Sequence, residues 1–65
     1  MKKFTYKKAQ SLQLNDSFSY SGMYWTVIDV SNIDGMSKIK ATNYRYGVRL
    51  LSLVGITNVK LRNNI

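Results

Sequence analysis

The chain lacks the residue types on which cross-linking, metal binding and much of catalysis usually depend. Its 65 residues include no Cys and no His, and its three acidic residues are all Asp. The absence of Cys excludes disulfides and thiolate metal sites, and the absence of His removes the commonest remaining zinc ligand. Stability must therefore come from side-chain packing or from a partner subunit.

The few carboxylates do not form a pattern that suggests chemistry. Asp34 lies in a turn signal, and Asp16 is interpreted as a turn or cap residue that accepts backbone hydrogen bonds before a strand. Asp29 is placed to pair with a lysine across strands, a contact worth at most about 1 kcal/mol when exposed. Neither a phosphate-binding glycine loop nor a zinc-ligand spacing is present. We therefore predict that the chain is not an enzyme and has no catalytic, cofactor-binding or metal-binding residues.

Long apolar runs are also missing. The longest apolar stretch, residues 48–56, is interrupted by Arg49 and Ser52, and it is far shorter than the ~20 residues needed to cross a bilayer. The basic start of the chain is not followed by the apolar region of a signal peptide. We expect a soluble cytoplasmic protein, in the host cytoplasm if the chain is viral.

Positive charge is abundant. Ten Lys and Arg residues against three Asp give a formal net charge of +7. This imbalance predicts a negatively charged partner, either a nucleic acid or an acidic protein surface.

Short runs of β-favouring residues separated by Gly and Asn predict an all-β fold. A chain of this length supports one domain and buries only about 60% of its unfolded surface. We predict a single five-stranded antiparallel small barrel over residues 9–65, with residues 1–8 as a basic N-terminal arm or edge strand. A short helical or 3₁₀ turn before the first core strand should place Leu12 and Leu14 on the barrel end.

Alternation of apolar and polar residues predicts which side chains face the core. Trp25 and Val27 are expected to point inward, with a bulge before Val30. Asp34 and Gly35 form the strongest turn signal, because they tolerate the positive φ angles of a two-residue hairpin. The other side chains expected to face the core are Phe18, Tyr20, Ile39, Ala41, Val59 and Leu61.

Two neighbouring segments resemble a known family. They are residues 12–18, Leu-Gln-Leu-Asn-Asp-Ser-Phe, and residues 20–27, Tyr-Ser-Gly-Met-Tyr-Trp-Thr-Val. Together they resemble the start of SH3-like small barrels, as in small bacteriophage proteins, KOW-type domains and the amino-terminal domain of elongation factor P. The match covers roughly residues 12–30 and departs at Asn15, where the pattern has Gly. The resemblance implies an SH3-like barrel. The lysine-bearing hairpin tip of elongation factor P has no counterpart in residues 32–35, so its activity is not implied.

Two sets of residues are candidates for binding. Cations at predicted solvent-facing strand positions would form a positive stripe that neutralises phosphates: Lys38, Lys40, Arg49, Lys60 and Arg62. Near a turn, Tyr44, Arg45 and Tyr46, together with Tyr24, interleave aromatic rings with a cation, as in proteins that stack bases. Both sets also have structural interpretations, since lysines on exposed strands prevent aggregation and tyrosines cover small cores.

These patterns favour a non-enzymatic module that binds DNA or RNA through a basic strand face with little sequence specificity. The alternative is a phage-type interaction factor that docks on an acidic host or virion protein. An open sheet edge would also allow a homo-oligomer.

Overall fold

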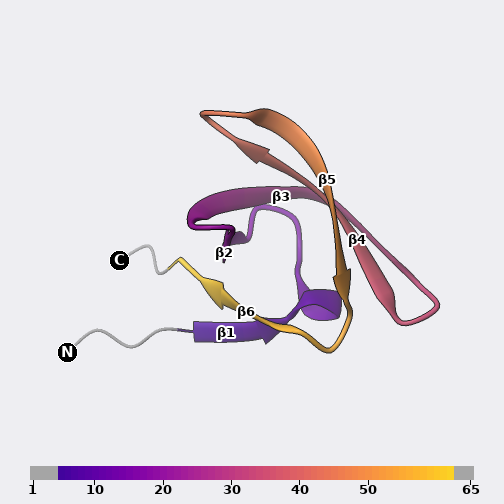
Figure 1. Ribbon diagram of the computed structural model, residues 1–65. Helices are drawn as coiled ribbons and strands as arrows, with labels where there is room; N and C mark the ends of the chain where they lie inside the picture. Colours follow the sequence, from indigo (N-terminus) through magenta and orange to yellow (C-terminus); the bar gives the residue numbers. More distant parts are fainter. Residues whose placement is uncertain (1–4, 63–65) are drawn as a thin grey trace.

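The computed structural model describes residues 5–62, which form one antiparallel sheet and a single 3₁₀ turn (Figure 1). The order of neighbouring strands in the sheet is β1-β6-β2-β3-β4-β5. In chain order the elements are β1 (Thr5–Lys8), the 3₁₀ turn η1 (Ala9–Ser11), β2 (Ser17–Tyr20), β3 (Met23–Ile33), β4 (Met36–Asn43), β5 (Gly47–Val54) and β6 (Asn58–Leu61). The prediction of an all-β antiparallel fold is confirmed.

The prediction of a five-stranded barrel is not confirmed, because the described residues form an open sheet of six strands. The additional strand is β1, which pairs with β6 and leaves β1 and β5 as the two edges. No ladder joins these edges within residues 5–62. Instead, η1 follows β1 and binds the β5–β6 connection through Ala9 N to Thr57 O, 2.8 Å, and Gln10 N to Gly55 O, 3.0 Å. The helical turn therefore lies where a barrel would close.

The segment between η1 and β2 forms a turn that explains one wrong prediction. Leu12 is buried as predicted, but Leu14 is 62% exposed. Asp16 closes the turn, since its N–H donates to Gln13 O at 3.1 Å and its Oδ2 accepts from Gln13 N at 2.9 Å. Asn15 has a φ of 73°, the left-handed conformation that Asn tolerates better than most residues. Leu14 lies within this turn and faces solvent.

A β-bulge in β3 lets apolar side chains from both halves of the strand face the same core. Val27 pairs with Ala41 and Asp29 pairs with Lys40, so Ile28 is an extra residue without its own partner. Trp25 and Val27 are buried before the bulge, and Val30 packs against the core after it. The predicted bulge before Val30 is confirmed. Strict alternation from Val27 would have turned Asp29 toward the core.

The β3–β4 hairpin turns at Asp34 and Gly35, whose φ angles of 51° and 77° match the predicted two-residue turn. Beyond it, β4 alternates regularly, with Ser37, Ile39, Ala41 and Asn43 buried. The predicted inward positions of Ile39 and Ala41 are confirmed.

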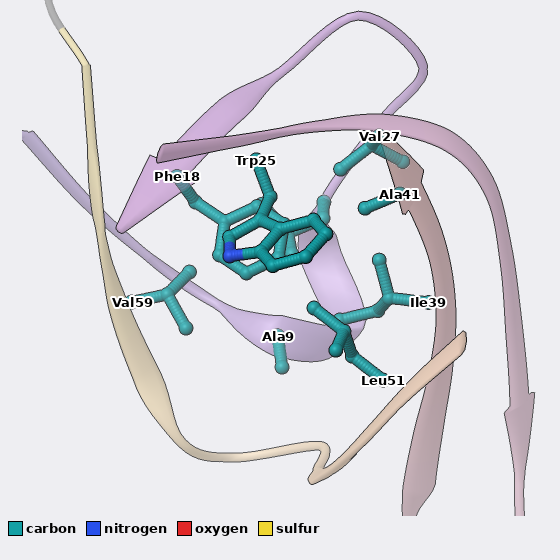
Figure 2. Close-up of a cluster of buried hydrophobic side chains, with 9 residues drawn as sticks. Ala9, Phe18, Trp25, Val27, Ile39, Ala41, Leu51 and Val59 are labelled. Atoms are coloured by element: carbon teal, nitrogen blue, oxygen red, sulfur yellow. The ribbon is translucent and has the colours of Figure 1, made fainter. Parts of the chain in front are cut away.

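The buried apolar side chains form one cluster beneath the curved sheet (Figure 2). Phe18 and Trp25 lie together at its centre, and the Trp25 Nε1 donates to Tyr20 O at 3.1 Å. Tyr20 and Leu61 pack against the cluster from partly buried positions. The fully or nearly buried members are Ala9, Leu12, Phe18, Trp25, Val27, Ile39, Ala41, Leu51 and Val59. None of the helical segments in residues 5–62 has the length and apolar character of a membrane-spanning helix.

Candidate nucleic-acid interface

The register of the sheet divides its side chains between two faces. We call the face that carries the buried cluster the inner face, and the opposite face the outer face. Residues paired directly across antiparallel strands share a face. Each strand pair therefore shows on which face a predicted site residue lies.

Lys38 and Lys40 lie on the outer face of β4, as the sequence predicts, and both are exposed. Lys38 is opposite Ser31 on β3 and Ser52 on β5. Lys40 is opposite Asp29 on β3 and Leu50 on β5. Consecutive outer positions on a strand are about 6.6 Å apart, so the two ammonium groups can contact neighbouring phosphates of one strand.

Lys60 and Arg62 lie on the outer face near β6. Lys60 is opposite Tyr6 of β1, while the neighbouring Val59 is buried on the inner face. Arg62 follows β6, and its backbone N–H donates to Ser17 O at 2.8 Å. Three strand spacings, about 14 Å, separate β6 from β4. The cations therefore form two groups on one face instead of one continuous stripe.

Arg49 lies on the other face. It is directly opposite Ala41, which is completely buried, so its exposed side chain starts from the inner face of β5. The structure therefore does not bring Arg49 together with Lys38 and Lys40.

A cleft on the outer face occupies the space between the two groups of cations. Its volume is about 420 Å³. The lining residues come from β2, the β2–β3 turn, β3, β4 and the segments that follow β4 and β6: Ser17, Gly22, Met23, Tyr24, Thr26, Thr42, Asn43, Tyr44 and Arg62. None of them is acidic, so the described lining carries one formal charge, the guanidinium of Arg62.

Aromatic rings and a cation meet in this cleft. The Arg62 guanidinium carbon lies 5.7 Å from the centroid of the Tyr24 ring, within the range of a cation–π contact. Tyr44 is 98% exposed at the cleft, so its ring faces can accept a stacked ligand. Hydroxyl groups line the floor, where the Oγ of Ser17 and the Oγ1 of Thr26 are 3.2 Å apart.

The β4–β5 turn separates the two predicted tyrosines. Whereas Tyr44 lines the outer cleft, the ring of Tyr46 stacks on Trp25, with centroids 6.3 Å apart and 14° between the planes. Arg45 covers Tyr46, with its guanidinium carbon 5.6 Å from the ring centroid. The Tyr46 ring therefore covers Trp25 while remaining 47% exposed, which fits the structural interpretation of this tyrosine.

Asn43 holds the turn in this arrangement. It is 4% exposed, and its Nδ2 donates to Tyr24 O at 2.9 Å. Its Oδ1 accepts from the backbone N–H of Arg45 at 2.7 Å and of Tyr46 at 3.3 Å. The side chain thus connects the two strands beside the cleft to the turn that carries Tyr44.

Sequence reasoning missed Asn43 and the cleft hydroxyls of Ser17, Thr26 and Thr42. Trp25 and Val27 were expected to point inward. The alternation of β3 therefore already implied that Tyr24 and Thr26, which line the cleft, point outward. The turn that Asn43 closes had a local signal, because Asn often accepts hydrogen bonds from backbone groups two and three residues later. Its contact with Tyr24 had none, because the two residues are 19 positions apart. Within residues 5–62, no three His, Cys, Asp or Glu side chains come close enough to hold a metal ion.

Comparison of the chain with protein-family models, curated proteins and solved structures gave no match. The resemblance of residues 12–30 to SH3-like barrels therefore stays a prediction.

Proposed function

We propose that the chain binds nucleic acid on its outer face, with little sequence specificity and a preference for single strands. The observation that carries this proposal is the cleft in which Tyr24, Tyr44 and Arg62 come together. An unpaired base can stack on Tyr44, because every base has an aromatic face, and such stacking contributes about 1–3 kcal/mol per base.

The cations on either side of the cleft can contact the phosphate backbone of a bound strand. Arg62 lies on one side of the cleft. On the other side, Lys40 lies two residues before the cleft residue Thr42 on β4, and Lys38 lies two residues before Lys40. Contacts of this kind neutralise phosphates, release counterions and carry no sequence information. The hydroxyl groups of the floor can donate to or accept from any base edge, which is consistent with low specificity.

The test is a fluorescence-anisotropy titration of protein stripped of nucleic acid, using a labelled oligothymidylate and a labelled duplex at two salt concentrations. We expect tighter binding to the single strand and weaker binding at higher salt. Tyr44→Ala should weaken binding to the single strand more than binding to the duplex, because paired bases cannot stack on the ring.

A matched pair of variants distinguishes binding at the cleft on the outer face from binding that depends only on net charge. Arg62→Gln and Arg49→Gln remove the same charge from the same residue type, and both side chains are exposed. Only Arg62 lies at the cleft, so Arg62→Gln should weaken binding and reduce the salt slope by about 0.7 for a single strand. Equal effects of the two variants would show that binding depends on charge alone and would contradict the proposed site.

A further inference from the structure

Strand β5 is a sheet edge with few of the features that normally prevent pairing. It has eight residues, Gly47–Val54, and Arg49 is its only charged residue. Within residues 5–62, β4 is its only strand neighbour. The opposite edge, β1, has four residues and carries Lys7 and Lys8. Natural proteins protect sheet edges by short length and charge. Strand β1 is short and carries two lysines, whereas β5 is twice as long and carries one arginine.

Exposed apolar side chains accompany this edge on the outer face. Val48, Leu50 and Val54 are 51%, 66% and 51% exposed. Ile33 continues the apolar surface beyond the β4 residue Met36, and it is 53% exposed. The edge therefore offers unpaired backbone groups and apolar contact area together.

The distribution of charge allows a second copy of the chain to pair at this edge. Two copies of a chain with a net charge of +7 repel each other, so they can meet only where cations are sparse. Antiparallel pairing centred on Leu51 places Arg49 opposite Leu53 of the partner subunit and separates the two Arg49 residues by about 13 Å along the strand. In this register, three strand spacings, about 14 Å, separate Lys40 from Lys38 of the partner subunit, which exceeds the screening length of about 8 Å in physiological salt.

We propose that two copies of the chain pair through their β5 edges in this antiparallel register, with Leu51 opposite Leu51 of the partner subunit. The two-fold axis is perpendicular to the sheet, so each outer face continues into the outer face of the other copy. The two open sheets become one, and Lys38 and Lys40 of both copies lie on a single surface. The pairing needs no nucleic acid and stands independently of the proposed binding function.

Sedimentation equilibrium of nucleic-acid-free protein over a wide concentration range tests the pairing. We expect a mass twice the 7.5 kDa of one chain. Leu50→Lys should weaken association at least about tenfold, since it places two new like charges diagonally across the junction. Leu14→Lys is the matched control, because Leu14 is 62% exposed outside the edge and the substitution adds the same charge. It should leave the mass unchanged.

Spin labels test the register. The chain has no Cys, so Ser52→Cys can be labelled with a nitroxide at one position. In the proposed register, the two Ser52 positions are diagonal neighbours about 7–8 Å apart, and their spectrum should be dipolar-broadened. A label at Ser31→Cys should show no broadening, since the two Ser31 positions are at least five strand spacings, about 24 Å, apart.

Circular dichroism confirms that each variant is folded. If Leu50→Lys does not fold, Ser52→Lys replaces it, because Ser52 is exposed and lies opposite Leu50 of the partner subunit. A monomer at all concentrations, an association unaffected by the folded edge variant, or sharp spectra from the Ser52 label in the dimer would overturn the proposal.

Discussion

The Tyr46 ring lies nearly parallel to the Trp25 indole, at an interplanar angle of 14°. Trp25 is 6% exposed and belongs to the central cluster, so Tyr46 forms a cover over the largest core side chain. Tyr44, two residues earlier, is almost fully exposed. The same short turn thus places one aromatic ring against the core and leaves another exposed to solvent.

Tyr46→Ala should therefore destabilise the fold, while Tyr44→Ala should not. Loss of the stacked ring should lower the free energy of unfolding by about 1–2 kcal/mol, and Tyr44→Ala should change it by less than about 0.5 kcal/mol. Urea unfolding followed by Trp25 fluorescence measures both, because the chain has one Trp. Equal stability of the two variants would show that the stack does not contribute to the fold.

Asn43→Ala should be strongly destabilising for a polar-to-apolar change. It removes one donor and one acceptor that serve three backbone groups, at a cost of about 1–3 kcal/mol. Asn58→Ala is the matched control. Asn58 is exposed on β6, so removal of its side-chain amide should hardly change the free energy of unfolding. Thermal unfolding monitored by circular dichroism gives the difference, and a neutral Asn43→Ala would mean that water replaces the side chain without loss.

Gly35→Ala should destabilise the β3–β4 hairpin through its backbone alone. No atom lies within 4 Å of a Cβ added at Gly35, but its φ of +77° is unfavourable for Ala, at about 1–2 kcal/mol. Gly35→Asn should cost less, because Asn adopts this conformation more readily. Chemical unfolding of both variants checks the order, and an Asn variant less stable than the Ala variant would argue against a backbone origin.

Asp29→Asn should tighten nucleic-acid binding. Asp29 lies directly opposite Lys40 on the outer face, where its carboxylate opposes the approach of a phosphate. A charge interaction of up to about 1 kcal/mol across strands corresponds to a gain of about twofold to fivefold in affinity. Asp34→Asn removes the same charge at the hairpin tip and is the control in the same anisotropy titration. If both variants gain equally, the effect of Asp29 is one of net charge.

Much of the fold was predictable, because local signals agreed with the pairing of the strands. In β4, apolar Ile39 and Ala41 alternate with Lys38 and Lys40, so one assignment of faces satisfies all four positions. The hairpin turn followed from Asp34 and Gly35, whose positive φ angles few other residue pairs tolerate as well.

The parts that were wrong or undetermined depend on contacts between distant segments. Arg49 was expected to share a solvent-facing stripe with Lys38 and Lys40, but its pairing with Ala41 places it on the inner face. Alternation could not show this, because Leu50 and Leu51 are both apolar. The sequence left residues 1–8 as an arm or an edge strand, and only the pairing of β1 with the distant β6 decides between them for residues 5–8. The sheet is open because no ladder joins β1 to β5 within residues 5–62. The cleft is likewise assembled from four separate segments.

The bulge at Ile28 also has a consequence for motion. It interrupts the ladder in the middle of the longest strand, where Asp29 Oδ1 accepts a hydrogen bond from Val30 N at 3.0 Å. Local opening begins where the ladder is disrupted and exposed to solvent. Amide protons beside Ile28 should therefore exchange with solvent faster than those of Trp25 or Ile39.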